Sequence, residues 1–182
     1  MKKIIIILLV ILLTYGLIYR MEKSQSKDVY ASRNKVLPSI FITPTPSPVD
    51  ERLVKLQKFF KKYNSSLYDF SKKFIEVSDK YGFDWKLLPA ISGVESTFGK
   101  FTPSCAKYNP FGWTSTTSPC GFYRFSSFSE AIEVVGRGIG TESFYDKFRK
   151  TKRIEDLAKV YCPVDDKWDK NLYYFISELE KI

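Results

Sequence analysis

The sequence predicts a small all-α domain with one irregular or short β-hairpin lobe, preceded by a single transmembrane helix. Three observations predict this. Residues 51–182 repeat apolar side chains at helical spacing between helix caps and stops. Residues 100–126 are punctuated by proline and glycine. Residues 4–19 are apolar and uncharged. With 182 residues, 44% of them hydrophobic, the chain has material for one domain plus attachments.

The first twenty residues are predicted to be a signal anchor. The apolar run from Ile4 to Tyr19 follows two lysines and is closed by Arg20. It is shorter than the roughly 20 residues that span a bilayer comfortably, and no small-x-small cleavage motif follows it. A buried core helix is the alternative, but every face of the run is apolar. We therefore expect an uncleaved single-pass anchor in the cell membrane.

The orientation of this anchor rests on two opposed signals. Basic residues after the run outnumber the two lysines before it, which favours a cytoplasmic C-terminal side. A three-residue tail before a short apolar core is instead typical of an export signal, and long segments translocate with little regard to charge. We expect the C-terminal domain to lie on the extracytoplasmic side.

Residues 21–50 are predicted to form a disordered stalk, because they are rich in proline, serine and threonine and carry few large apolar side chains. Beyond them, residues 51–182 contain 22 Lys and Arg against 17 Asp and Glu, a charge of +5. This excess favours polyanionic surroundings such as nucleic acid, anionic lipid or an acidic cell wall. No nucleic-acid-binding signature occurs, so we expect no nucleic-acid partner, and we expect a monomer.

Six helices are predicted in the domain from apolar spacing, caps and stops. They span about 51–63 (capped by Asp50), Asn64 or Ser65 to Gly82, Asp84 to Gly99, 127–148, 153–161 and 166–181. The fourth opens with Ser127 and Glu130 in the spacing of a capping box.

Missing residue types exclude several kinds of site. There is no histidine, which excludes Ser-His-Asp and Cys-His nucleophiles and histidine-based zinc or iron sites. Three cysteines cannot form a four-cysteine zinc site, so we expect no metal and no cofactor. Cys105 and Cys120 bracket a loop-rich segment and are predicted to form a disulfide in an exported domain. The alternative pairs Cys162 with one of them.

Glu95 is the most informative ionisable residue. It falls inside the apolar stripe of the third predicted helix, four residues after Ile91 and seven after Leu88. A carboxylate on an apolar face loses hydration, which raises its pKa as a general acid near neutral pH requires. Alternatively, Glu95 ends its helix with the carboxylate in water or paired with Lys100.

Five short motifs follow one another around and after Glu95. They are YGFDWKLLPAISGVESTFGK (Tyr81–Lys100), NPFGW (Asn109–Trp113), FSSFSEAI (Phe125–Ile132), ESFYDKF (Glu142–Phe148) and KVYCPVDDKW (Lys159–Trp168). In order and spacing they resemble the lysozyme-like peptidoglycan glycosidases, closest to the glucosaminidases of glycoside hydrolase family 73. The resemblance covers about residues 75–182, and its Glu-Ser motif is shared with lytic transglycosylases. It implies a lysozyme-like fold and action on peptidoglycan glycan strands.

The resemblance also implies a site. Glu95 would be the acid that protonates the glycosidic oxygen, with Ser96 beside it in the Glu-Ser motif. The remaining predicted positions are Asn109, Phe111 and Gly112 at the floor of the cleft and Tyr145 and Tyr161 along its wall. Trp113, next to this floor, is the better candidate among the lobe aromatics for stacking on a sugar. Each has a structural alternative: Phe111 as core, Gly112 as a turn, and the tyrosines as packing.

One departure from the family pattern concerns a second acid. Glycoside hydrolysis normally needs two carboxylates, yet no Asp or Glu occurs between Ser96 and Ser129. Glu130 is a substitute candidate as well as a capping residue, and Glu142 is a lesser one. The sequence therefore predicts a membrane-anchored peptidoglycan hydrolase of the N-acetylglucosaminidase type. The alternatives are a lytic transglycosylase that forms 1,6-anhydro products, a non-catalytic wall-binding module, or a membrane-proximal adaptor.

Overall fold

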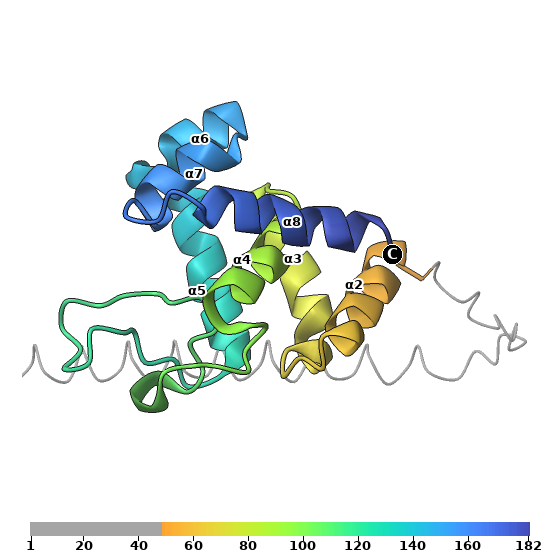
Figure 1. The fold of residues 1–182 in the computed structure, drawn as a ribbon, viewed down its shortest axis with the longest axis horizontal. Helices are drawn as coiled ribbons and strands as arrows, with labels where there is room; N and C mark the ends of the chain where they lie inside the picture. Colours follow the sequence, from red (N-terminus) through yellow and green to blue (C-terminus); the bar gives the residue numbers. More distant parts are fainter. Residues whose placement is uncertain (1–48) are drawn as a thin grey trace, which may run out of the picture. The chain divides into compact units, whose positions relative to one another are not determined.

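The structure is a computed structural model that describes residues 49–182 (Figure 1). The predicted anchor at 1–20 and all but the end of the predicted stalk at 21–50 lie outside these residues. Within residues 49–182, no helix is long and apolar enough to cross a membrane.

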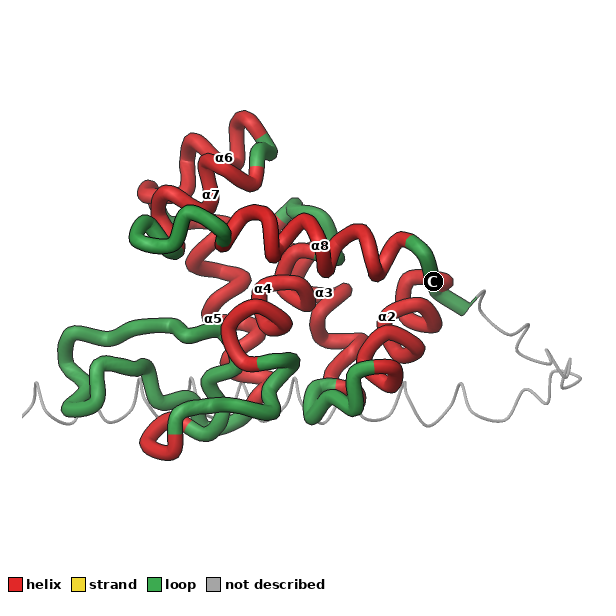
Figure 2. The backbone as a smooth tube through the Cα atoms, viewed as in Figure 1, coloured by secondary structure: helices red, strands yellow, loops and turns green. Residues whose placement is uncertain are grey.

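The described chain is almost wholly helix and loop, which confirms the all-α prediction (Figure 2). Its elements in order are α2 (Glu51–Lys62), η2 (Tyr68–Phe70), α3 (Ser71–Tyr81), α4 (Leu87–Ser96), η3 (Ser104–Ala106), α5 (Phe128–Thr141), η4 (Ser143–Tyr145), α6 (Asp146–Thr151), α7 (Ile154–Tyr161) and α8 (Trp168–Glu180). The three η elements are single 3₁₀ turns.

The predicted start of the first helix is confirmed, and the predicted start of the second is wrong. Asp50 caps α2 as expected, because its carboxylate accepts a hydrogen bond from the Arg52 backbone N–H at 2.9 Å. The second helix begins at Ser71 rather than at Asn64 or Ser65. Asn64 has a positive φ of 49°, and the Ser65 hydroxyl donates to the Phe98 carbonyl at 2.9 Å. The start of the predicted helix is thus a turn that contacts the segment just after α4.

Helix α4 ends three residues before the predicted stop at Gly99. Thr97, Phe98 and Gly99 all have positive φ angles, of 50°, 61° and 80°. This left-handed run is costly for Thr and Phe, but it places the Phe98 ring fully in the core, edge-on to Phe59 at 5.2 Å. Burial of that ring therefore outweighs the tendency of the segment to continue as a helix.

The fourth predicted helix is really two helices. Helix α5 ends at Thr141 instead of about 148, because Glu142 adopts an extended conformation. The Arg149 guanidinium then donates to the carbonyls of Ile139 and Glu142, at 3.0 and 2.7 Å, and so satisfies the end of α5. The chain turns through η4 into α6, and this turn buries Tyr145. The α7 and α8 predictions are correct to within two residues.

The core forms where α3 packs against α5 and where α8 packs across α4, a crossing visible in Figure 1. Its largest fully buried side chains include Trp168, Phe59, Phe60, Phe74, Phe98 and Phe111. Each such side chain contributes about 1.5–3 kcal/mol through burial. Two of them, Trp168 and Phe111, belong to segments of the predicted site, so the site is built directly on the core.

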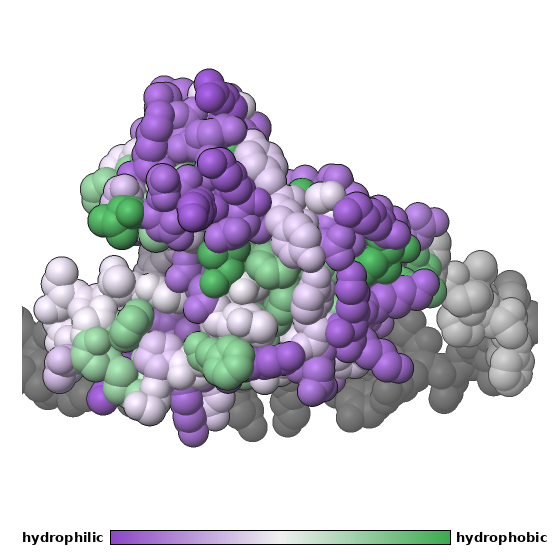
Figure 3. Space-filling model, viewed as in Figure 1, coloured by the Kyte–Doolittle hydropathy of each residue, from purple (hydrophilic) through white to green (hydrophobic). Residues whose placement is uncertain are grey.

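Residues 97–127 form the lobe, which is irregular apart from the 3₁₀ turn η3 and one isolated bridge between Thr114 and Phe122. A disulfide joins Cys105 to Cys120, as predicted, and Cys162 is free. On the face drawn in Figure 3, hydrophilic residues dominate over α6 and α7, whereas the lobe is mostly neutral to hydrophobic. On this face the disulfide-linked lobe is thus less hydrophilic than α6 and α7.

Candidate active site around Glu95

Glu95 lies in the last turn of α4, with its side chain partly buried. Its Oε1 atom accepts a hydrogen bond from the indole Nε1 of Trp168, the first residue of α8, at 2.7 Å. Trp168 is the only hydrogen-bond donor to this carboxyl within residues 49–182. The Oε1 atom of Glu95 is therefore bound to a buried indole, and its Oε2 atom accepts no hydrogen bond from residues 49–182.

The surroundings of Glu95 raise the pKa of its carboxyl above the ordinary value. Burial is the largest cause, since it disfavours the charged form. The Trp168 hydrogen bond opposes this in part, and the negative charge of Asp165 adds to it. Glu95 therefore keeps its proton to higher pH than an exposed glutamate, which is the property that a general acid needs.

Gly112 lies against the free oxygen of Glu95. Its φ is +62°, and a Cβ atom built on it would collide with Glu95 Oε2. The left-handed backbone therefore favours glycine at this position, and any larger residue would have to push the Glu95 carboxyl aside. The prediction that the NPFGW segment lies beside the acid agrees with this contact.

Asn109 and Ser96 hold that segment in place. Asn109 is 1% exposed, donates to the carbonyls of Trp113 and Tyr123 at 2.7 and 3.0 Å, and accepts from the Trp113 N–H at 3.0 Å. The buried Ser96 hydroxyl donates to the Pro110 carbonyl at 2.8 Å and accepts from the Gly99 N–H. The polar groups of both side chains are thus used internally, and both residues position the loop.

A cavity of about 470 Å³ opens beside Glu95. Gly112 and Asn109 form part of its wall, and the lobe contributes Lys100, Phe101 and Phe122. Glu95 is the only carboxylate, and Lys100 the only cation, among the residues that line it. Phe101 is 73% exposed, so its ring is available for contact with a ligand.

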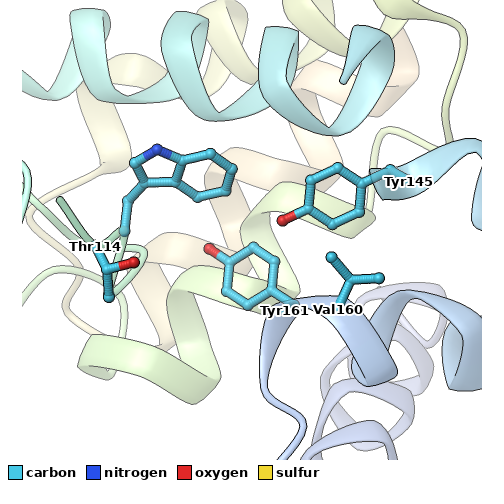
Figure 4. A pocket seen from close by; sticks show the side chains of 6 residues that line it. Thr114, Tyr145, Val160 and Tyr161 are labelled. Atoms are coloured by element: carbon cyan, nitrogen blue, oxygen red, sulfur yellow. The ribbon is translucent and has the colours of Figure 1, made fainter. Parts of the chain in front are cut away.

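A second cavity, of about 220 Å³, shares Gly112 with the first and contains the predicted aromatic wall. Figure 4 shows Tyr145 and Tyr161 reaching into it from two different segments, with Val160 beside them. The Trp113 ring stacks on that of Tyr145, with centroids 6.5 Å apart and planes at 26°. The structure thus brings Trp113, Tyr145 and Tyr161 together, although they are far apart in sequence.

The two tyrosines differ in what their hydroxyls do. The Tyr161 hydroxyl donates to the Phe111 carbonyl at 2.7 Å and so supports the loop. Burial, together with the charge of Glu142, raises the pKa of Tyr145 to about 12. Tyr145 therefore remains a neutral phenol at physiological pH, able to donate a hydrogen bond to a ligand in the cavity. Phe111 itself is fully buried in the core.

Glu130 lies apart from this constellation. Its carboxylate accepts from the backbone N–H and the hydroxyl of Ser126, both at 2.6 Å, and these bonds lower its pKa. The Ser127 hydroxyl accepts from the Glu130 N–H at 3.1 Å, which is one half of the predicted capping box. Glu130 lines neither of the two cavities beside Gly112. The structure therefore gives it the capping role rather than that of a second acid.

Trp168 and Asp165 are neighbours of Glu95 that the sequence motifs did not predict. Trp168 ends the KVYCPVDDKW motif, but no local pattern indicates that its indole reaches a residue 73 positions earlier. Asp165 is the one carboxylate whose charge raises the pKa of Glu95. Its own side chain accepts from the Lys167 N–H at 2.9 Å, which fixes it just ahead of α8.

Within residues 49–182, no group of three or more Cys, Asp or Glu side chains is arranged to hold a metal ion. No protein-family model matches this chain, and no curated protein matches it significantly. The proposals for function that follow therefore rest on the sequence motifs and on the geometry around Glu95.

Proposed function

We propose that this protein is a membrane-anchored glycosidase that cleaves β-1,4 bonds in the glycan strand of peptidoglycan, with Glu95 as the general acid. The observation that carries this proposal is the state of the Glu95 carboxyl. It is partly buried, has a raised pKa, is bound through one oxygen only, and lines a cavity that shares Gly112 with a second one. The motif resemblance to lysozyme-like glycosidases supports the same substrate class.

The cavities on the two sides of Gly112 suit a chain of sugars. An oligosaccharide that crosses Gly112 would have residues on both sides of the bond next to Glu95. The exposed ring of Phe101 lies on one side, and the Trp113 and Tyr145 rings lie on the other. Contacts with several sugars would hold the bond in place, and such positioning is a major source of rate acceleration.

The chemical step would begin with proton transfer from Glu95 Oε2 to the glycosidic oxygen. The bond between that oxygen and the anomeric carbon then breaks, and the leaving sugar takes the proton as a hydroxyl. Because Glu95 is the only carboxylate lining its cavity, we propose that the acetamido oxygen of the substrate bonds to the anomeric carbon. Water then opens this intermediate, gives a reducing end and returns a proton to Glu95.

A lytic transglycosylase is the second candidate, favoured by the same lack of a second carboxylate in the cavity. In that reaction the C6 hydroxyl of the cleaved sugar replaces water, loses its proton to Glu95 and forms a 1,6-anhydro ring. Glu95 has the same role in both reactions. The family 73 resemblance favours hydrolysis.

The predicted anchor and stalk would confine cleavage to wall material near the membrane. The lobe between Ser96 and Ser129 carries Lys100, Lys107 and Arg124 and no acidic residue. Such a surface attracts anionic polymers, which supports an acidic cell wall as the partner.

The test is mass spectrometry of the soluble products that the full chain, solubilised in detergent, releases from purified peptidoglycan. Reducing ends are expected for the hydrolase, and the sugar at that end identifies the bond that is cut. Fragments lighter by one water would instead identify a lytic transglycosylase.

The matched variant for this test is Glu95→Gln, which keeps the shape of the side chain but cannot donate a carboxylic proton. We expect at least a 100-fold loss of product, with an unchanged circular dichroism spectrum. Undiminished cleavage by this variant would exclude Glu95 as the acid. Tight binding to the wall without fragments from the wild-type chain would make the protein a binding module.

A further inference from the structure

Four segments form a closed ring of contacts around the Glu95 carboxyl. The Trp168 indole N–H donates to Glu95 Oε1 at 2.7 Å, and the indole stacks on the Tyr161 ring, 5.1 Å away at 23°. The Tyr161 hydroxyl donates to the Phe111 carbonyl at 2.7 Å. The next residue, Gly112, lies against Glu95 Oε2. Helices α4, α7 and α8 and the lobe are thereby joined through one carboxyl group.

We infer that Trp168 is a positioning residue that determines which oxygen of Glu95 carries the transferable proton. An indole nitrogen only donates hydrogen bonds, so the oxygen it binds must act as an acceptor. When Glu95 is protonated, its proton therefore resides on Oε2, the oxygen beside Gly112 and the cavity. The consequence for chemistry rests on the proposed role of Glu95 as general acid.

The burial of Trp168 makes this constraint persistent. Its side chain is 1% exposed, so water does not replace Glu95 as the acceptor of the indole N–H. Leaving a buried donor without a partner costs more free energy than a typical hydrogen bond contributes. The bond is therefore expected in both protonation states of Glu95. An exposed glutamate, by contrast, would carry its proton on either oxygen.

The charged and titratable groups around Glu95 come from three segments. Asp165 lies ahead of α8, Tyr161 and Cys162 lie at the end of α7, and Lys100 lines the cavity from the lobe. Burial first, and then the nearby Glu95, raise the pKa values of Tyr161 and Cys162, so both are uncharged at neutral pH. Asp165 and Lys100 are thus the charged neighbours of Glu95 in the described part of the chain.

These neighbours predict opposite shifts for two variants. Trp168→Phe keeps an aromatic ring against Tyr161 but removes the donor that favours the charged carboxylate, so the pKa of Glu95 should rise. Asp165→Asn removes a negative neighbour, so the pKa of Glu95 should fall. Tyr161→Phe keeps the ring on Trp168 and removes a neutral hydroxyl, and should leave the pKa of Glu95 nearly unchanged.

The measurement is NMR titration of the full chain in detergent, labelled with 13C at glutamate carboxyls and 15N at tryptophan indoles. The Glu95 carboxyl signal is the one that disappears in Glu95→Gln. In the wild-type chain, the Trp168 indole signal should shift with the same midpoint as that carboxyl, and this shared titration should vanish in Glu95→Gln. An indole signal that ignores the titration of Glu95 overturns the inference, even if Trp168→Phe fails to fold.

Enzyme kinetics distinguish a role of Trp168 in placing the Glu95 proton from a purely structural role. Trp168→Phe should lower kcat about 100-fold through misplacement of the proton, with KM nearly constant. It should also move the alkaline limb of the pH–rate profile to higher pH, whereas Asp165→Asn should move it to lower pH. A loss of activity without the alkaline shift would indicate a purely structural role and overturn the inference.

The NMR result is independent of catalysis, so the two proposals can fail separately. If the Glu95 pKa stays constant or falls in Trp168→Phe, the positioning role is wrong and the glycosidase proposal is unaffected. If Glu95→Gln cleaves glycan at the wild-type rate, the proposed acid is wrong, while the titration still decides whether Trp168 places its proton.

Discussion

One glycine beside one carboxyl group sets the geometry of the candidate site at the scale of single residues. Gly112 lies against the Oε2 atom of Glu95 and lines both cavities, of which one is also lined by Glu95, and its left-handed backbone turns the loop past the acid. A side chain at this position would meet the Glu95 carboxyl and displace it. The position of the Glu95 carboxyl therefore depends on the lack of a side chain at Gly112.

Gly112→Ala tests this dependence. The added Cβ would displace Glu95 Oε2, so we expect at least a 100-fold loss of glycan cleavage. The left-handed conformation adds a loss of about 1–2 kcal/mol in the free energy of unfolding. Initial rates on purified peptidoglycan and urea denaturation measure the two effects.

Gly121→Ala is the matched control within the same lobe. Gly121 also has a positive φ, of 76°, but a Cβ atom there would meet nothing within 4 Å. The two variants should lose similar stability, and only Gly112→Ala should lose activity. Equal activity of the two would show that the contact with Glu95 has no catalytic consequence.

At the scale of elements, the lobe is a long irregular segment with little regular hydrogen bonding of its own. Its only bridge joins Thr114 to Phe122, so its shape depends on Asn109 and on the Cys105–Cys120 disulfide. Lys100, Phe101 and Phe122, which line the cavity beside Glu95, all belong to it. Loosening the lobe should therefore disturb the site more than the helical core.

Replacing both cysteines, Cys105→Ser with Cys120→Ser, tests the role of this cross-link. Loss of a disulfide across a loop of this length removes about 3 kcal/mol by the chain-entropy model. We expect a lower melting temperature, and a fall in glycan cleavage even at temperatures where the variant remains folded. Cys162→Ser removes a free thiol and is the control. Full activity in the double variant would show that the lobe keeps its shape without the cross-link.

At the scale of the whole molecule, α3 and α5 form a large part of the core, and Glu133 joins them at the surface. Its carboxylate accepts hydrogen bonds from Lys73, Lys80 and Tyr81, all on α3. The two lysines lower the pKa of Glu133 to about 2. Because the folded-state pKa is below the unfolded one, this group stabilises the fold above about pH 5 and loses that effect as the pH falls toward 2.

Glu133→Gln should therefore lower the free energy of unfolding by about 1–2 kcal/mol at pH 7, after allowance for the partial exposure of the side chain. Urea denaturation of wild type and variant at several pH values measures the difference, which should shrink between pH 5 and pH 2. Glu76→Gln, which breaks an exposed ion pair with Lys72 on α3, is the control and should change stability by less than about 1 kcal/mol. A difference that stays constant with pH would contradict the assigned pKa.

Local sequence patterns determined much of the fold. The Asp50 cap, the Gly82 stop and the Cys162-Pro163 break between α7 and α8 predicted helix ends close to those observed, because these signals act over only a few residues. The position of Glu95 on an apolar face likewise predicted a raised pKa from neighbours on the same helix. The loop composition around Cys105 and Cys120, together with the expected export of the domain, predicted the disulfide that the structure contains.

Only the tertiary structure decided which distant groups meet at the site. Helix α4 ends early because burial of Phe98 outweighs local propensity, and the break after α5 is what carries Tyr145 to Trp113. The contact of Trp168 with Glu95 depends on how α8 crosses α4, and such a crossing follows from the packing of whole helix faces. Sequence patterns thus identified the carboxyl group, and packing between helices selected the donor that holds it.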